Sequence, residues 1–137
     1  MGMFITGVKD GKSCIVEQVE TGAGSDSLLV TTLLDIPLND LPPRATGSAR
    51  HHEIHLPPDT VRWLRVYFPP NTLAALHHTD SIDCNTVVAG SAELILDDGP
   101  HKVTVGDSFA VNGVDHGWRT GDEGCTLSIL LIGLPPR

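Results

Sequence analysis

Short runs of apolar and β-branched residues, separated by turn residues, most constrain the fold of this chain. The 137 residues include 14 glycines and 10 prolines. The runs recur at intervals of about 8 to 12 residues, which is typical of a sandwich or barrel. Residues 9–12 and 97–100 each contain an Asp-Gly pair, a signal for a hairpin turn. Because no stretch of about 11 residues has a convincing helical period, the sequence predicts an all-β protein.

The expected strands cover residues 3–8, 13–19, 27–36, 61–68, 83–89, 92–96, 101–105, 106–111, 116–120 and 125–132. Residues 37–50 are rich in turn residues and are expected to form an irregular excursion. Residues 59–64 fit either one helical turn or an extended approach, and the two prolines before them favour the extended form. The length suits one domain, residues 1–137.

Charge and composition exclude several classes of partner. The formal net charge of -8 and the pI near 5.1 argue against nucleic acid and anionic membranes. The longest apolar run, residues 127–134, is too short for a membrane span, and the first residues have no secretory pattern. The three cysteines have no CxxC spacing. We therefore expect a soluble, reduced, cytoplasmic protein.

Histidine is the residue type that points to chemistry. The seven histidines are His51, His52, His55, His77, His78, His101 and His116. We expect His51, His52 and His101 to face solvent from loops or turns, and His55 to face solvent too, unless it lies on a strand and acts as a ligand. The informative segments are HHTDSID, at residues 77–83, and NGVDHGW, at residues 112–118.

These segments resemble the two motifs of the cupin superfamily, G-x5-H-x-H-x3,4-E-x6-G and G-x5-P-x-G-x2-H-x3-N. Six residues separate Asp83 from Gly90, as in the first motif, and Gly113-x2-His116 matches the second. More narrowly, H-x-T-D-S-I-D resembles a subgroup of small single-domain cupins. The resemblance implies a jelly-roll β-barrel, a double-stranded β-helix, with its core at residues 61–134. It also implies a homodimer whose interface uses residues 1–35, with strands of residues 1–36 packing on the barrel or on the partner.

The first motif fits in two registers, which differ in the histidine that faces the barrel interior. Either His77 stands in the first histidine position or His78 stands in the second. Side chains alternate between the two faces of a regular strand, so both cannot point inward unless a bulge intervenes. The subgroup has its histidine at the place of His77, which favours that register. Val111 departs from the second motif at its proline position.

Either register leaves two histidines and one carboxylate for a metal: His77 or His78, Asp83 in place of glutamate, and His116. Such a set leaves open positions on Fe(II), Mn(II), Ni(II) or Zn(II). It is one ligand short of the usual cupin four, so a metal-free barrel is an equal alternative. Asp83 as a buried anion is costly without a metal or base, which favours a functional role or a raised pKa.

Other residues have a functional and a structural interpretation. Trp118 is expected to pack over a substrate, and Arg65 to line the barrel mouth beside Trp63, unless that face is exposed. His116 is either a reactive group or a satisfied core histidine. Cys84 should point outward if Asp83 points inward.

The function hypothesis is a small-molecule enzyme of lyase, dehydratase or isomerase type. His77 (or His78), Asp83 and His116 would transfer protons at a small oxygenated substrate, with or without a divalent metal. The alternatives are an iron-dependent dioxygenase and a non-catalytic ligand-binding module. A transcriptional regulator is disfavoured because the sequence has no helix-turn-helix pattern or basic segment.

Overall fold

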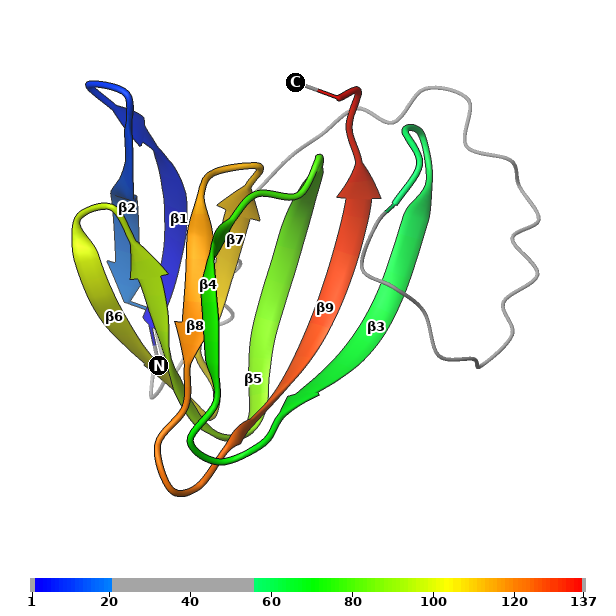
Figure 1. The fold of residues 1–137 in the computed structure, drawn as a ribbon. Coiled ribbons are helices and arrows are strands. Elements are labelled where there is room, and N and C mark those ends of the chain that lie inside the picture. The colour runs from blue at the N-terminus through cyan, green and yellow to red at the C-terminus, as the bar shows by residue number, and fades with distance from the viewer. Residues whose placement is uncertain (1, 21–55, 137) are drawn as a thin grey trace, which may run out of the picture.

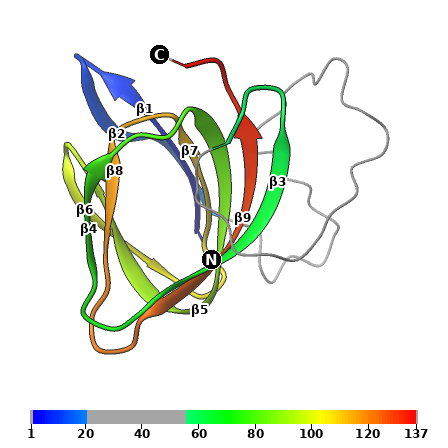
Figure 2. The same ribbon diagram turned by 45° about the vertical axis from the view of Figure 1, so that its right-hand side comes forward.

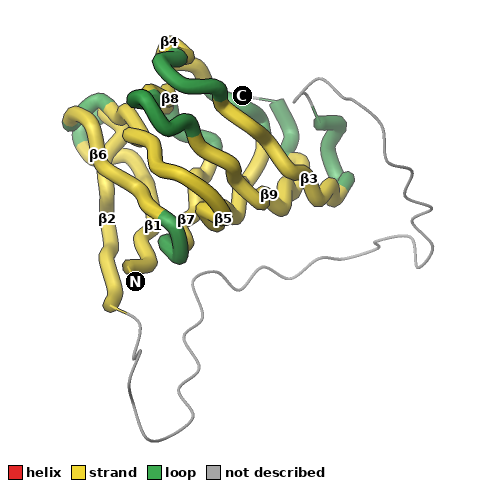
Figure 3. Tube along the Cα trace, turned by 90° about the horizontal axis from the view of Figure 1, so that it is seen from below, coloured by secondary structure: helices red, strands yellow, loops and turns green. Residues whose placement is uncertain are grey.

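In a computed structural model, which describes residues 2–20 and 56–136, every regular element is a β-strand. The strands are β1 (Gly2–Lys9), β2 (Lys12–Glu20), β3 (Val61–Phe68), β4 (Leu73–His77), β5 (Ser81–Leu96), β6 (Gly99–Thr104), β7 (Ser108–Asn112), β8 (His116–Arg119) and β9 (Cys125–Gly133). Figure 3 shows strands and loops without a helix in these residues. They thus include no helix that could cross a membrane.

The strands form two sheets that face each other (Figures 1 and 2). Sheet A has the order β2-β1-β7-β5-β9-β3, and sheet B has the order β6-β5-β8-β4. Neighbouring strands are antiparallel except β1 and β7, which are parallel. The first half of β5 belongs to sheet A, and its second half belongs to sheet B.

The pairing is that of one long hairpin rolled into a barrel. The turn at residues 97–98 joins β5 to β6, and moving outward from it, β5 pairs with β7, β4 with β8, and β3 with β9. The rolled hairpin closes because β5 also pairs with β8 and β9. This is the strand arrangement of a jelly roll. The expected all-β jelly-roll fold is therefore confirmed.

The core lies between the two sheets and is mostly aliphatic, in a sequence with only 4% aromatic residues. Its fully buried side chains include Leu94, Val103, Phe109, Leu127 and Leu131. The N-terminal hairpin joins the core through Phe4, whose ring stacks on Phe109 with a centroid distance of 4.8 Å. The first expected strands therefore extend sheet A within the same chain.

Several expected boundaries need correction. Residues 83–89 and 92–96 belong to one continuous strand, because Gly90 bends β5 from one sheet into the other without ending it. Strand β4 was not predicted, since its sequence LAALH lacks β-branched residues. The expected strand at 27–36, the excursion at 37–50, and His51, His52 and His55 lie outside the described residues.

Gly90 marks a change of phase in the alternation of β5. Residues 81, 83, 85 and 87 are buried before it, whereas residues 92, 94 and 96 are buried after it. A register shift between Val87 and Ala89 accompanies the change. Gly90 has a φ of +69°, and a Cβ there would lie 2.2 Å from the carbonyl oxygen of Gly124. The bend therefore requires glycine for its backbone conformation and for its close approach to the loop before β9.

We expect Gly90→Ala to lower the free energy of unfolding by about 3 kcal/mol, of which ~1–2 kcal/mol is the cost of a left-handed backbone. Gly11→Ala is the matched control, because Gly11 has a φ of +75° but nothing within 4 Å of its Cβ position. Gly11→Ala should therefore lower the free energy of unfolding only by the ~1–2 kcal/mol cost of the left-handed backbone. Urea denaturation measures both, and equal losses would show that the contact with Gly124 does not matter.

Candidate functional site

A cavity of about 100 Å³ lies between the two sheets and brings the predicted residues together. Its apolar lining residues are Leu64, Val66, Phe68, Ala74, Trp118, Ile129 and Leu131. Its polar lining residues are His77, Thr79, Asp83, Asn85 and His116. The volume is well below the roughly 300–1,000 Å³ of pockets for drug-sized ligands. The cavity therefore suits a small molecule or one end of a larger one.

His77 faces this cavity because of a β-bulge in β4. Ala74 pairs with Trp118 and His77 with His116, so Ala75 and Leu76 together stand opposite the single residue Gly117. The bulge fits closely against β8, since a Cβ on Gly117 would lie 2.7 Å from the carbonyl oxygen of Ala74. It shifts the alternation by one residue, so Ala74 and His77 both line the cavity.

His78 therefore points elsewhere, and its expected role as an alternative inward ligand needs correction. Its ring nitrogens lie 3.7 Å from Asp80 and 3.8 Å from Asp115, and its side chain is half exposed. His101 also lies outside the cavity, on the hairpin between β5 and β6, where its Nε2 is 2.6 Å from Asp98.

Asp83 is the buried carboxyl of the site, with 6% of its surface exposed. The Ser81 hydroxyl donates to its Oδ1 over 2.5 Å. Burial raises the pKa of Asp83 to about 6, and the Ser81 hydrogen bond and the nearby His77 only partly oppose this rise. The carboxyl thus exchanges its proton near neutrality, which is the property that sequence reasoning expected of a buried Asp83.

His116 is equally buried, with 3% exposed. Burial lowers the pKa of His116 below its ordinary 6.5, although the hydrogen bond to Val114 opposes the change. Its Nδ1 is 2.8 Å from the Val114 carbonyl oxygen. Because a carbonyl only accepts, Nδ1 carries the proton, and the lone pair of the neutral ring lies on Nε2.

His77 has the same arrangement. Its Nδ1 lies 2.8 Å from the Ala75 carbonyl oxygen, so the neutral ring keeps its lone pair on Nε2. The centroids of the His77 and His116 rings are 4.6 Å apart. His77 is solvent-exposed although it lines the cavity. It therefore stands where the cavity meets solvent, with His116 deeper inside.

The orientation of the two imidazoles suits metal ligation, since ligating histidines commonly donate their other N–H to a carbonyl. A metal centre also needs several side chains that converge on one point. In residues 2–20 and 56–136, no group of three or more His, Cys, Asp or Glu side chains is close enough to hold an ion. His77, Asp83 and His116 therefore do not fit the expected three-ligand metal centre.

Trp118 lines the cavity, and its expected packing over a substrate stays a prediction. Its ring stacks on Phe68 at 5.5 Å and presents an edge contact to His116 at 6.2 Å.

Arg65 does not line the cavity, which corrects its expected role. Strand β3 turns Leu64, Val66 and Phe68 inward, so alternation places Arg65 on the outer face with Trp63, which is 77% exposed.

Asn85 and Thr79 line the cavity although neither was predicted as a site residue. Asn85 follows Asp83 by two residues on the same strand, so the period-two rule applied to Asp83 would have found it. Thr79 is in the loop after the bulge, where no periodicity applies. Cys84 lies between the two inward residues and is partly exposed, as expected from the orientation of Asp83.

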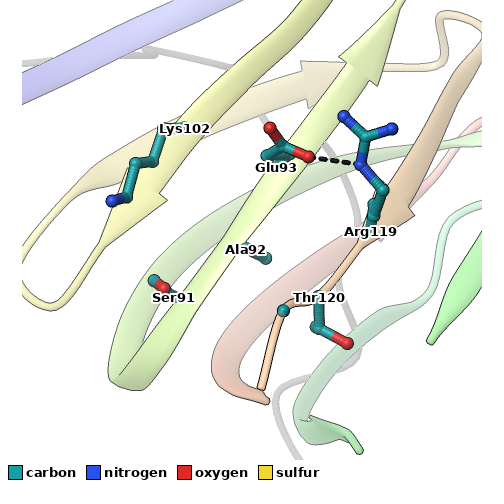
Figure 4. Close-up of a pocket in the computed structure, with 7 residues that line it drawn as sticks. Ser91, Ala92, Glu93, Lys102, Arg119 and Thr120 are labelled. Carbon is teal, nitrogen blue, oxygen red and sulfur yellow. Dashed lines mark hydrogen bonds and ion pairs between the residues drawn. The ribbon is translucent and has the colours of Figure 1, made fainter. Parts of the chain in front are cut away.

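A larger and more open hollow, of about 340 Å³, lies over β5, β6 and β8 (Figure 4). Its charged lining residues are Glu93, Lys102 and Arg119, and Arg119 donates a hydrogen bond to Glu93. None of the buried titratable residues reaches it. We therefore take the smaller interior cavity, which holds Asp83 and His116, as the candidate site.

Comparisons with known proteins concern the fold. No family model matches the sequence, and no curated protein matches it. Among solved structures, the chain is similar to an RmlC-like cupin from Shewanella frigidimarina, with 25% identity over 52% of this chain and 64% of that one, and a TM-score of 0.47. The match thus spans less than two thirds of the Shewanella protein.

Two other similar structures come from proteins with different functions. One is the Cupin_2 domain of an XRE family transcriptional regulator from Enterobacter cloacae, with 17% identity over 56% of this chain and 83% of that one, and a TM-score of 0.46. The other is a sugar phosphate isomerase of the cupin superfamily from Silicibacter pomeroyi, with 22% identity over 55% and 50%, and a TM-score of 0.43. Cupins are thus among the proteins that this chain resembles in structure. The narrower subgroup stays a prediction.

The raised pKa of Asp83 predicts a specific pH dependence of stability. Between about pH 4 and pH 6 the unfolded chain has lost the proton that folded Asp83 keeps, so the contribution of Asp83 to stability decreases as the pH rises. From 3.8 to about 6, this loss is about 3 kcal/mol. The free energy of unfolding of Asp83→Asn, relative to that of the wild type, should therefore increase by about 3 kcal/mol between pH 4 and pH 7. Urea denaturation at each pH measures this difference.

Asp97→Asn is the control, because Ser13 hydrogen bonds lower the pKa of Asp97 instead of raising it. Its contribution is lost only at more acidic pH, so this variant should keep the wild-type slope between pH 4 and pH 7. An unchanged slope in Asp83→Asn would contradict the raised pKa.

Proposed function

We propose that this chain is a small-molecule enzyme of isomerase or lyase/dehydratase type, which moves protons next to a carbonyl group. The observation that carries the proposal is that Asp83 and His116 both line one small cavity. Burial raises the pKa of the acid and lowers the pKa of the imidazole. The two values move toward each other, which suits a pair that exchanges protons near neutral pH.

Asp83 and His116 have complementary roles in this reaction. Protonated Asp83 donates its proton to the carbonyl oxygen of the substrate, while Nε2 of His116 removes a proton from the neighbouring carbon, which yields an enol. Nε2 is the basic atom because Nδ1 is held by the Val114 carbonyl. Low-dielectric surroundings strengthen both interactions with the developing charges.

Two outcomes are open to the enol. If it is an enediol, His116 returns its proton to the former carbonyl carbon while Asp83 recovers a proton from the second hydroxyl, and a hydroxy ketone is isomerised. If a hydroxyl group stands on the next carbon, His116 gives its proton to that group, which leaves as water. Asp83 takes back the proton of the enol oxygen in the same step, so that the carbonyl group re-forms and the carbon–carbon double bond shifts to the carbon that lost the hydroxyl. The first outcome is an isomerase reaction and the second a dehydratase reaction.

Two further residues support this assignment. The hydrogen bond from Ser81 fixes the carboxyl group of Asp83. His77, exposed at the edge of the cavity and 4.6 Å from His116 between ring centroids, is placed to exchange protons with solvent. The apolar lining residues, which include Phe68 and Trp118, fit the carbon skeleton of a substrate.

The alternatives receive unequal support. A dioxygenase would rely on two histidines and a carboxylate around iron, and the described side chains do not converge in that way. A ligand-binding module without turnover is favoured by the small volume and the apolar lining residues of the cavity. The homodimer and the cytoplasmic location stay predictions.

The proposed proton transfer can be tested without knowing the natural substrate. In deuterated buffer near neutral pH, the protein should accelerate deuterium incorporation next to the carbonyl of butanone, hydroxyacetone or dihydroxyacetone, measured by ¹H NMR. Because general acid–base groups typically contribute about 10²–10⁴-fold, Asp83→Asn and His116→Ala should each reduce the accelerated rate by about 100-fold or more.

His78→Ala is the matched control, since His78 lies beside the site but faces Asp80 and Asp115. This variant should keep the wild-type rate. Exchange that is unaffected by Asp83→Asn and His116→Ala would contradict the assigned roles. Ketones that bind without any accelerated exchange would instead support the binding-module alternative.

A further inference from the structure

Asn85 is a buried polar residue of the cavity to which the acid–base reaction gives no role. It lies two residues after Asp83 on β5, lines the same cavity, and is 2% exposed. Residues two apart on a strand are about 7 Å apart at their backbones and share a face. A small ligand at Asp83 is therefore also within reach of Asn85.

The hydrogen bonds of Asn85 fix which way its amide points. Its Nδ2 donates to the backbone carbonyl oxygens of Asp83, at 2.9 Å, and Phe109, at 3.5 Å. Because carbonyl oxygens only accept, the NH₂ group must face them. The Oδ1 atom is thereby held on the other side of the amide.

This Oδ1 is buried and has no hydrogen-bond partner among residues 2–20 and 56–136. Such an atom is unusual, since the large majority of buried polar atoms are paired, and leaving one unpaired is costly. Asn85 also lines the cavity, so a donor group of a ligand bound there is a candidate partner for this acceptor.

The same part of the chain contains a useful comparison. Asn112 also has a buried, unpartnered Oδ1, and its Nδ2 also donates to a backbone carbonyl, that of Thr6 at 3.2 Å. Asn112 is not among the residues that line the cavity. An effect of ligand binding on Asn85 should therefore not extend to Asn112.

We propose that Asn85 is a specificity-determining residue whose Oδ1 accepts a hydrogen bond from a hydroxyl group of the ligand. The ligand class is then a small hydroxy carbonyl compound, with its carbonyl at Asp83 and its hydroxyl one or two carbons away at Asn85. A hydroxyl fits better than an ammonium group, because a cation in this mostly apolar cavity would need a full counter-charge. The inference deepens the proposed function and rests on it for the position of the carbonyl.

Hydroxyacetone and butanone test this proposal, because they have the same size and differ by a hydroxyl in place of a methyl group. Each is titrated into the ¹⁵N-labelled full chain, and the affinity is measured from shifts in ¹H–¹⁵N spectra. The wild type should bind hydroxyacetone about tenfold or more tightly than butanone. The side-chain NH₂ signals of Asn85 should move with hydroxyacetone, and those of Asn112 should not.

Asn85→Leu removes the acceptor at similar size and should abolish or reverse the preference, whereas Asn112→Leu should keep it. If Asn85→Leu does not fold, the proposal is still tested by the preference of the wild type for hydroxyacetone over butanone and by the shift of the Asn85 side-chain NH₂ signals. Equal wild-type affinities, no measurable binding of hydroxyacetone, or a preference retained in Asn85→Leu would overturn the proposal. Binding with the preference but without deuterium exchange would contradict only the proposed reaction, and exchange without the preference would contradict only the role of Asn85.

Discussion

The two-residue alternation of side chains along a strand is the constraint on which this structure depends, and it is interrupted in β4 and in β5. The bulge opposite Gly117 turns His77 into the barrel, and the bend at Gly90 lets β5 bury one set of residues in sheet A and the other set in sheet B. Both interruptions need glycine because another backbone approaches closely. The positions of the reactive groups thus follow from the way the two sheets close around one core.

Burial of Asp83 connects the stability of the fold to the chemistry of the site. A carboxyl between two sheets is desolvated, and the single Ser81 hydroxyl compensates for this only in part, so its pKa rises to about 6. The same desolvation lowers the pKa of His116. The cavity therefore destabilises the charged forms of both groups, and this is the property on which the proposed proton exchange with a small carbonyl compound depends.

Much of the fold could be predicted from local sequence. The Asp-Gly turns, the β-branched runs and the spacing of turn residues predict most strands and both hairpins, because these features act between residues close in the chain. The two motifs indicated Asp83 and His116, and the structure buries both side chains in one cavity. Strand β4 was missed because LAALH has no strand propensity of its own and is held in place by its pairing with β8.

The sequence by itself determined an all-β jelly roll and narrowed the candidate reactive groups to a few histidines and one aspartate. Only the tertiary structure decided between His77 and His78, because a bulge is a mismatch between two paired strands and neither strand encodes it alone. Tertiary structure also put Arg65 on the outer face and left Asn85 with an unpaired oxygen beside Asp83. The orientation and the desolvation of a side chain depend on the residues across the barrel, and these residues are distant in the sequence.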